Sequence, residues 1–383
     1  MNKQNQLADI HNSGRPYIIY KSKRGFDLYT NFSRKIILNN KNIKSFLTKK
    51  NKKQSTNTDL FIGFFGYELL NNLIDVKVPK QKNFNFPKGI FYKPEKKIKL
   101  SNKLNYDFEN FKSGNFKINI NRKNYTKIFN KFKKKIKSGE TYQIKICTKY
   151  KTKSKINPLD FFSRLSTTNL APEAFMIKDD KYSIISCSPE TLITKKGSDI
   201  STKPIAGTVK KTRQLNKIKA LNYFRKNLKE TKEHNMIVDM ERNDLSRICK
   251  VGSVKLSKQK IVEEYKDLFH YVSLIKGKLK KNINNLEIIK AMMPGGSVIG
   301  CPKINTLNLL NNQEKENRNI YTGSFGYIKF NGDMRFNIII RSILNFKNIS
   351  EISVASGVVV DSNANHEFNE NFLKAKALID LFK

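Results

Sequence analysis

The hydrophobic pattern is clearest in the C-terminal third of the chain, where apolar and polar positions alternate. Apolar runs at residues 327–330 and 334–344 flank Asn331 and Gly332. Asn-Gly between two such runs is the strongest short signal for a β-hairpin. A further apolar run at residues 352–360 predicts another strand. This part of the sequence therefore predicts a β-sheet built at least partly from antiparallel strands.

Other segments repeat their apolar residues at helical spacing. Residues 121–139 place large apolar side chains on one stripe, and a second helix is expected near residues 214–245. Between them, residues 142–147 alternate as a strand, with Tyr142 and Gln143 on opposite faces. A last helix carries a stripe that we expect in the core: Phe368, Phe372, Ala375, Ile379 and Phe382.

Helices and strands mix without a regular strand–helix–strand rhythm, which disfavours a doubly wound parallel sheet. We expect an α+β fold in which large mixed or antiparallel β-sheets pack together with helices outside. Residues 1–115 look like basic linkers interrupted by short apolar runs, of which residues 60–70 are the clearest. Residues 93–103 are predicted to be a surface loop.

The chain has 383 residues and a formal net charge of +42. A clustered basic surface would indicate a nucleic-acid-binding protein, which is the non-enzyme alternative. Lys and Asn occur instead throughout the chain, so we interpret the charge as a bias of surface positions that would still attract an anionic substrate. The four cysteines form no CxxC pair, as expected for reduced thiols in a cytoplasmic protein. No apolar run approaches the roughly 18 residues of a membrane span.

Acidic residues on two predicted helices could bind a metal ion. Glu233 lies one turn before Ile237, at the edge of an apolar face where an unpaired carboxylate is disfavoured. Glu367 and Glu370 lie one turn apart on the last helix, with Lys374 one turn further. Two such carboxylates can share Mg²⁺, although a solvated, ion-paired stripe would explain the same spacing.

Arg341 stands among apolar residues in the segment FNIIIRSIL. Strand alternation would place Arg335, Asn337, Ile339 and Arg341 on one face. An arginine in these surroundings should have an anionic partner such as a carboxylate, unless it reaches solvent near the end of the strand.

Two glycine-containing segments could form ligand-binding loops. PGGSVIGCPK has the glycine spacing of a phosphate-binding loop, but Cys301 and Pro302 stand where Lys and Ser/Thr are required, so this interpretation fails. In KPIAGTVKK, Gly207 and Thr208 offer backbone N–H groups and a hydroxyl to a ligand. A plain turn would also explain the second segment.

Nine segments occur in one order: SCSPE (186–190), PIAGT (204–208), EHNMIVDMERNDLSRI (233–248), FHYVS (269–273), PGGSVIGCPK (294–303), YTGSFGYI (321–328), IIIRS (338–342), GVVVDS (357–362) and EFNENFLKAKA (367–377). Together they resemble the chorismate-utilising enzymes, which include component I of anthranilate synthase, component I of aminodeoxychorismate synthase, and isochorismate and salicylate synthases. The resemblance runs from about residue 120 to the end, with a weak match at FIGFFGYE (61–68). It implies a chorismate-binding catalytic domain at residues 116–383 and a divergent region at residues 1–115 that contributes strands to the same fold.

The resemblance implies a Mg²⁺-dependent reaction on chorismate, in which Glu190 protonates the departing hydroxyl. Arg341 and Tyr321 would bind the enolpyruvyl carboxylate. The implied metal ligands are Glu233 and Glu370, with Glu367 as a further candidate. The implied substrate cradle is Gly207, Thr208, Ser356, Gly357 and Lys374. The further catalytic positions are Gln143 and His270, and His270 would orient the substrate.

The choice of family member depends on a few positions. Gln143 stands where isochorismate and salicylate synthases carry a Lys base, which favours a member that uses ammonia. PGGS, MRFNIIIRS and the short N-terminal region resemble aminodeoxychorismate synthase component I, with anthranilate synthase component I as the alternative. Ala206 stands where many aminodeoxychorismate synthases carry a nucleophilic Lys, so no covalent adduct can form there, and Lys145 is a candidate substitute.

The sequence also bears on the source of ammonia. It has no GxCxG nucleophile elbow, so we expect a separate glutamine amidotransferase subunit to bind as a heterodimer and supply ammonia. A degenerate, non-catalytic family member is disfavoured because Glu190, Glu233, Arg341 and Glu370 are all present.

Overall fold

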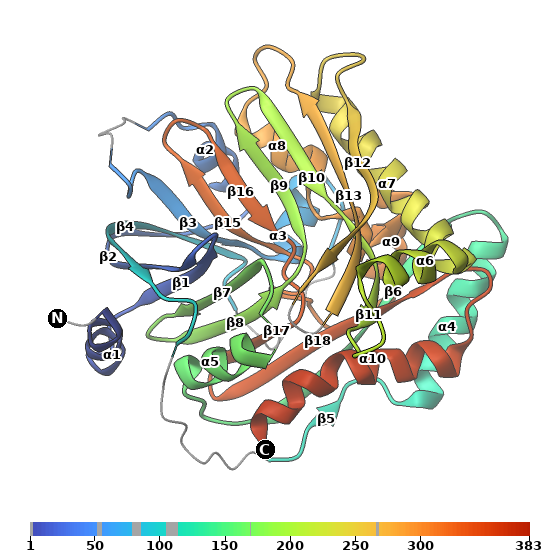
Figure 1. Ribbon diagram of the computed structural model, residues 1–383, viewed down its shortest axis with the longest axis horizontal. Helices are drawn as coiled ribbons and strands as arrows, with labels where there is room; N and C mark the ends of the chain where they lie inside the picture. The colour runs from blue at the N-terminus through green and yellow to red at the C-terminus, as the bar shows by residue number, and fades with distance from the viewer. Residues whose placement is uncertain (1–2, 52–55, 79–85, 105–113, 169, 266–267) are drawn as a thin grey trace.

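The computed structural model describes residues 3–51, 56–78, 86–104, 114–168, 170–265 and 268–383 (Figure 1). Its strands are β1 Tyr17–Ser22, β2 Gly25–Ile37, β3 Leu60–Phe65, β4 Gly89–Leu100, β5 Lys117–Ile118, β6 Gln143–Lys153, β7 Glu173–Lys178, β8 Tyr182–Ser188, β9 Thr191–Lys196, β10 Asp199–Lys203, β11 Ile205–Lys210, β12 Lys255–Glu264, β13 Leu268–Lys278, β14 Gly300–Cys301, β15 Ser324–Lys329, β16 Met334–Asn337, β17 Ser342–Phe346 and β18 Ile349–Val358. Its helices are α1 Lys3–Asn12, α2 Ile43–Thr48, α3 Tyr67–Leu73, α4 Arg122–Lys137, α5 Pro158–Thr168, α6 Lys217–Lys226, α7 Leu228–Ile248, α8 Asn285–Met292, α9 Lys303–Gln313 and α10 Ala364–Ile379, with short 3₁₀ turns η1 Gly296–Val298 and η2 Asp380–Phe382.

The strands form one hydrogen-bonded ladder. Neighbours pair in the order β6–β18–β17–β8–β7–β1–β2–β4–β3–β15–β16–β9–β10–β13. β11 and β12 also pair with β13, and β5 and β14 also pair with β6. All of these pairings are antiparallel, and α4, α6, α7 and α10 lie along one side of the molecule (Figure 1). The expected α+β fold with large antiparallel sheets is confirmed.

Strands from the first hundred residues belong to this ladder, because β1 pairs with β7 and β3 pairs with β15. The predicted surface loop at residues 93–103 is wrong, since most of it belongs to β4, which pairs with β2. Ile98 and Leu100 point into the core while Lys99 between them is exposed. Because lysines occupy several of the positions between the buried residues, the sequence did not reveal this alternation.

Asparagine side chains begin several helices. The expected helix at residues 214–245 is two helices, and Asn227 separates them by accepting a hydrogen bond from the backbone N–H of Glu230 at 3.2 Å. An Asn side chain at a helix start satisfies a backbone N–H that the helix leaves unpaired. The same role is played at five helix starts by Asn121, Asn216, Asn227, Asn284 and Asn363.

The C-terminal hairpin forms across the Asn331-Gly332 turn, but its second strand is shorter than expected. β16 pairs with β9 and ends at Asn337, and β17 pairs with β8 from Ser342 onward. Residues 338–341 between them are not a strand, so the predicted alternation through Arg341 is wrong. Arg341 has a positive φ of 50°, because the chain changes its pairing partner at this point.

The last helix buries a different face from the one expected. Ala375 and Phe382 are buried, whereas Phe372 is 48% exposed. The buried face includes Glu367 and Asn371 instead, which are 1% and 0% exposed. Tyr142 is likewise 63% exposed and lies just before β6. No helix of the described part of the chain is long and apolar enough to cross a membrane.

Candidate active site

A cavity of about 700 Å³ lies between β6, β11, α7 and α10. This volume is typical of small-molecule sites. Eight of the predicted site residues line it: Gly207, Thr208, Glu233, Arg341, Gly357, Glu367, Glu370 and Lys374. The structure therefore brings together residues from five segments that are distant in the sequence.

Glu233 on α7 faces two side chains of β6. Its Oε1 accepts hydrogen bonds from Gln143 Nε2 at 2.8 Å and from Lys145 Nζ at 3.0 Å. The positive charge of Lys145 and these hydrogen bonds outweigh the effect of burial and lower the pKa of Glu233 to about 2. Glu233 is therefore a carboxylate at neutral pH. Gln143 does not line the cavity, but it hydrogen-bonds Glu233, which does.

Glu190 occupies the turn between β8 and β9 and is 5% exposed. Its Oε1 accepts a hydrogen bond from the hydroxyl of Ser297 at 2.8 Å, and Ser297 lines the cavity. Burial raises the pKa of Glu190 to about 7, although the Ser297 bond and the charge of Lys145 oppose the rise. A carboxyl group with this pKa can donate a proton at neutral pH.

The SCSPE segment (186–190) hydrogen-bonds residues 338–341, the non-strand segment that includes Arg341. Ser186 and Ser188 donate their hydroxyls to the carbonyls of Ile340 and Ile338, at 2.9 Å and 2.5 Å. The backbone N–H of residue 187 also donates to the carbonyl of Arg341 at 3.2 Å, and that of Ile338 donates to the carbonyl of Glu190 at 3.1 Å. These bonds hold residues 186–190 and residues 338–341 together beside the cavity.

The guanidinium of Arg341 lines the cavity without a counter-ion. In the described ranges it has no ion pair and no side-chain hydrogen bond with another residue, and burial lowers its pKa from the ordinary value. Arg335, six residues earlier, pairs with the fully buried Glu173. A partly buried guanidinium without a protein partner is able to bind an external anion such as a carboxylate.

An acidic cluster lies on the first turns of α10. His366, Glu367 and Glu370 can bring one ligand atom each within 4.8 Å of one another. Glu370 also pairs with Lys374 at 2.6 Å, and although burial opposes its charge, the charge of Lys374 keeps its pKa below the ordinary value. His366 was missed from the sequence, and its signal was its position one turn before Glu370 on the same helical face. Glu233 lines the same cavity but does not belong to this cluster.

The donor set of these acids fits a hard divalent cation. Carboxylate oxygens are the ligands that Mg²⁺ prefers, together with oxygens of water or substrate. Glu367, which is 1% exposed, and Glu370, which is partly buried, both line the cavity from α10. Glu367 and Glu370 are therefore compatible with a bound metal ion, and Glu233 lines the same cavity outside their cluster.

Gly207 and Thr208 line another wall of the cavity, and His270 lies behind Thr208. The hydroxyl of Thr208 hydrogen-bonds His270 Nδ1 at 2.8 Å, and burial lowers the pKa of His270 to about 4, so the ring is neutral. Gly207 has a φ of 96°, and a Cβ there would lie 2.8 Å from the ring of Phe224. Glycine is therefore required at this position both by conformation and by space. His270 supports Thr208 and does not line the cavity itself.

Two further predicted residues lie behind the wall. The hydroxyl of Ser356 hydrogen-bonds the hydroxyl of Tyr125 on α4 at 2.9 Å. Tyr321 packs with Cys147 and Ala355, under the guanidinium of Arg318 at 5.9 Å. Neither residue lines the cavity.

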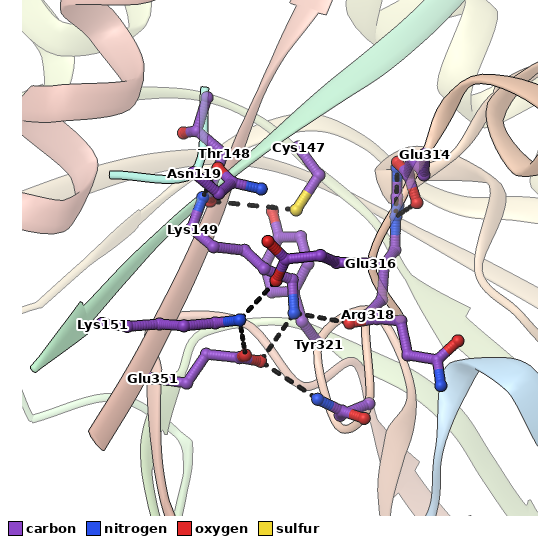
Figure 2. A network of polar contacts seen from close by, with 12 residues as sticks. Asn119, Cys147, Thr148, Lys149, Lys151, Glu314, Glu316, Arg318, Tyr321 and Glu351 are labelled. Atoms are coloured by element: carbon purple, nitrogen blue, oxygen red, sulfur yellow. Dashed lines mark hydrogen bonds and ion pairs between the residues drawn. The ribbon is translucent and has the colours of Figure 1, made fainter. Parts of the chain in front are cut away.

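Figure 2 shows the polar network around Tyr321. Arg318 is 1% exposed and binds Glu314 at 2.6 Å and the carbonyl of Lys145 at 3.0 Å. In the same network, Lys149 pairs with Glu351 at 2.7 Å. Every charge in this network has a partner, so its role is to hold β6 in place beside the cavity.

An antiparallel α+β fold whose cavity sets several acids against an unpaired guanidinium suits an enzyme that acts on a small anionic molecule. The chain belongs to the chorismate binding enzyme family, whose match covers residues 106–380. It is 34% identical over 267 residues to aminodeoxychorismate synthase component 1 of Bacillus subtilis, a match that covers 70% of this chain and 57% of that protein. It is 31% identical over 347 residues to an anthranilate synthase component I-like protein of Synechocystis, covering 83% of this chain and 72% of that protein.

Solved structures agree with this assignment. Anthranilate synthase component I of Streptococcus pneumoniae superimposes with a TM-score of 0.78 at 25% identity, covering 95% of this chain and 92% of that one. The menaquinone-specific isochorismate synthase of Escherichia coli, at 15% identity, superimposes with a TM-score of 0.77 over 96% of this chain and 89% of that one. The second likeness shows the fold alone.

Proposed function

We propose that this chain aminates chorismate at C4 to give 4-amino-4-deoxychorismate, with ammonia from a separate glutamine amidotransferase subunit. The observation that carries the proposal is the unpaired guanidinium of Arg341 in the cavity. Chorismate is a small dianion, and one of its carboxylates would supply the missing counter-ion. The formal net charge of +42 would also draw a dianion toward the protein.

Glu190 is the proposed general acid. Its pKa of about 7 leaves a large fraction of the carboxyl groups protonated at neutral pH. The proton would pass to the C4 hydroxyl of chorismate as the C4–O bond breaks, and water would leave. Ser297 holds the carboxyl group in one orientation through its hydrogen bond to Oε1.

Glu367, Glu370 and Glu233 are the proposed ligands of Mg²⁺. A bound Mg²⁺ would supply a positive charge to the ring carboxylate of chorismate. The three side chains come from two helices, so the proposed site would form only in the folded chain, where α7 and α10 both line the cavity.

The nucleophile in this proposal is ammonia itself. Ala206 lines the cavity where a catalytic lysine would otherwise stand. Burial opposes the charge on Lys145, but the attraction of Glu233 raises its pKa above the ordinary value. Lys145 is therefore an ammonium that holds Glu233, and an ammonium has no lone pair with which to attack chorismate.

Formation of anthranilate is the second candidate function. Relatives of this chain include anthranilate synthase component 1 of Aquifex aeolicus, 32% identical over 316 residues and covering 82% of this chain. That protein and the Bacillus relative support the two products about equally. Gln143 favours an ammonia-using member without separating the two products, so we base the choice of product on the PGGS and MRFNIIIRS segments.

The test is an assay of the purified chain with chorismate, Mg²⁺ and ammonium. We expect 4-aminobenzoate to appear only after a lyase that cleaves 4-amino-4-deoxychorismate is added. Anthranilate fluorescence without that lyase would establish the second candidate, and no consumption of chorismate would overturn both. We also expect glutamine to replace ammonium only when an amidotransferase subunit is present.

A further inference from the structure

Lys145 holds Glu233 in a position that a metal ion would also need. Lys145 and Gln143 are alternate residues on one face of β6, and both donate to the same oxygen, Oε1 of Glu233. The third acid-bearing element, α10, contributes Glu367 and Glu370 to the same cavity. Glu233 is thus tied to the strand and stands outside the acidic cluster of the helix.

The neighbouring strand is adapted to this contact. Gly357 of β18 lies opposite Lys145 in the ladder. A Cβ at Gly357 would stand 2.7 Å from Lys145 Nζ and 2.8 Å from Gln143 Nε2, so any larger residue would push the lysine or the glutamine aside. The missing side chain allows both donors to reach Glu233.

An ammonium and a divalent cation compete for the same carboxylate. Both bind through the oxygen lone pairs, and two positive charges on one oxygen repel strongly in a partly buried cavity. The Lys145 side chain is 13% exposed and that of Glu233 is 26% exposed, so water screens this repulsion only in part. A cation that is to use Oε1 of Glu233 must therefore displace Lys145, and a cation on the other carboxylate oxygen would still be repelled by the nearby ammonium.

We infer that Lys145 is a built-in competitor of the divalent cation at Glu233, and that the cation binds Glu233 only as the ammonium of Lys145 leaves it. This inference rests on the metal site of the proposed function. It makes Lys145 a positioning residue that holds Glu233 in place until the cation arrives. It also predicts that the resting enzyme binds Mg²⁺ weakly, although three acids are available.

The test measures Mg²⁺ affinity of the whole chain by calorimetry, without chorismate. Lys145→Met removes the ammonium with little change in side-chain length, and we expect it to bind Mg²⁺ about tenfold more tightly, as the loss of one charge-assisted hydrogen bond implies. Lys145→Gln, which keeps a polar group if the Met variant folds poorly, should also bind more tightly. Lys145→Arg should stay within about threefold of the native chain, because the positive charge remains.

The matched control is Lys151→Met on the same strand. Lys151 pairs with Glu316 outside the cavity, so this change removes one unit of charge without freeing Glu233. We expect its Mg²⁺ affinity to stay within about twofold of the native value, because Lys151 pairs with Glu316 and Glu351 and not with Glu233.

Equal or weaker Mg²⁺ binding by both Lys145→Met and Lys145→Gln would overturn the inference, as would a similar gain in Lys151→Met. A complete lack of Mg²⁺ binding in every variant would overturn it as well. The ammonium-dependent turnover of chorismate is measured separately on the native chain. If the native chain turns over chorismate but the Lys145 variants bind Mg²⁺ no more tightly than it does, only this inference is refuted. If the native chain does not turn over chorismate, the proposed function is refuted.

Discussion

Arg341 and Arg335 offer a paired test of which arginine serves the fold and which serves a ligand. Arg335 neutralises Glu173, which is fully buried, whereas Arg341 has no acidic partner in the described part of the chain. We therefore expect Arg335→Met to destabilise the ligand-free chain and Arg341→Met not to. The positive φ at Arg341 does not bias the comparison, because Met and Arg meet the same backbone strain there.

The magnitudes follow from these contacts. Arg335→Met leaves a buried carboxylate without its cation, which should lower the free energy of unfolding by about 3 kcal/mol. Arg341→Met removes a partly buried charge that has no partner, so the ligand-free chain should be unchanged or about 1 kcal/mol more stable. The same change removes charge-assisted hydrogen bonds to the chorismate carboxylate, worth about 3 kcal/mol, so kcat/KM should fall about a hundredfold.

The assays are urea denaturation of both variants without ligand and the ammonium-dependent turnover of chorismate. Arg341→Lys serves as a further variant that keeps the charge but not the planar fork, and it should recover part of kcat/KM. If Arg341→Met destabilises the ligand-free chain as much as Arg335→Met does, the guanidinium has a structural partner and the assignment of an anion site is wrong.

Three further predictions concern the same cavity. Glu190→Gln should lower kcat at least about a hundredfold. Because the folded pKa of Glu190, about 7, exceeds the ordinary value of 4.5, its contribution to stability is full below pH 4.5 and is lost as the pH rises through 7, so urea midpoints of Glu190→Gln should fall less over this range. Ser297→Ala removes a bond that lowers the pKa of Glu190, so the alkaline limb of the kcat profile should move to higher pH, whereas an unmoved limb would remove Glu190 from that ionisation. Gly207→Ala should destabilise the chain by about 2 kcal/mol. The control is Gly252→Ala, at a φ of 71° with open space around it, which should cost only about 1 kcal/mol of stability. Equal losses in the two variants would show that the contact with Phe224 does not contribute.

Sequence patterns predicted the fold class and eight of the residues that line the cavity, because these depend on apolar periodicity and on ordered motifs. The patterns failed where tertiary pairing overrides local alternation. Arg341 was predicted on a strand, yet residues 338–341 leave the ladder, since the hydroxyls of Ser186 and Ser188 take the carbonyls that a strand partner would use. A contact across some 150 residues has no local signal.

The abundance of Lys and Asn obscured other boundaries. Asn227 ends one helix and begins the next, but it is one of many asparagines in a polar stretch. In β4, charged residues occupy the exposed positions so densely that the strand resembled a loop. The contacts of Lys145 with Glu233 and of Ser297 with Glu190 depend on the relative placement of distant elements, so periodicity carries no information about them.

The hydrogen bonds that join residues 186–190 to residues 338–341 have a consequence for selectivity. They join the backbone of Glu190, the proposed proton donor, to that of Arg341, the proposed anion binder. The distance between these two side chains is therefore fixed by the backbone, and a ligand must have the matching length to contact both at once. Small acids of other lengths should be rejected by this spacing even where the cavity has room for them.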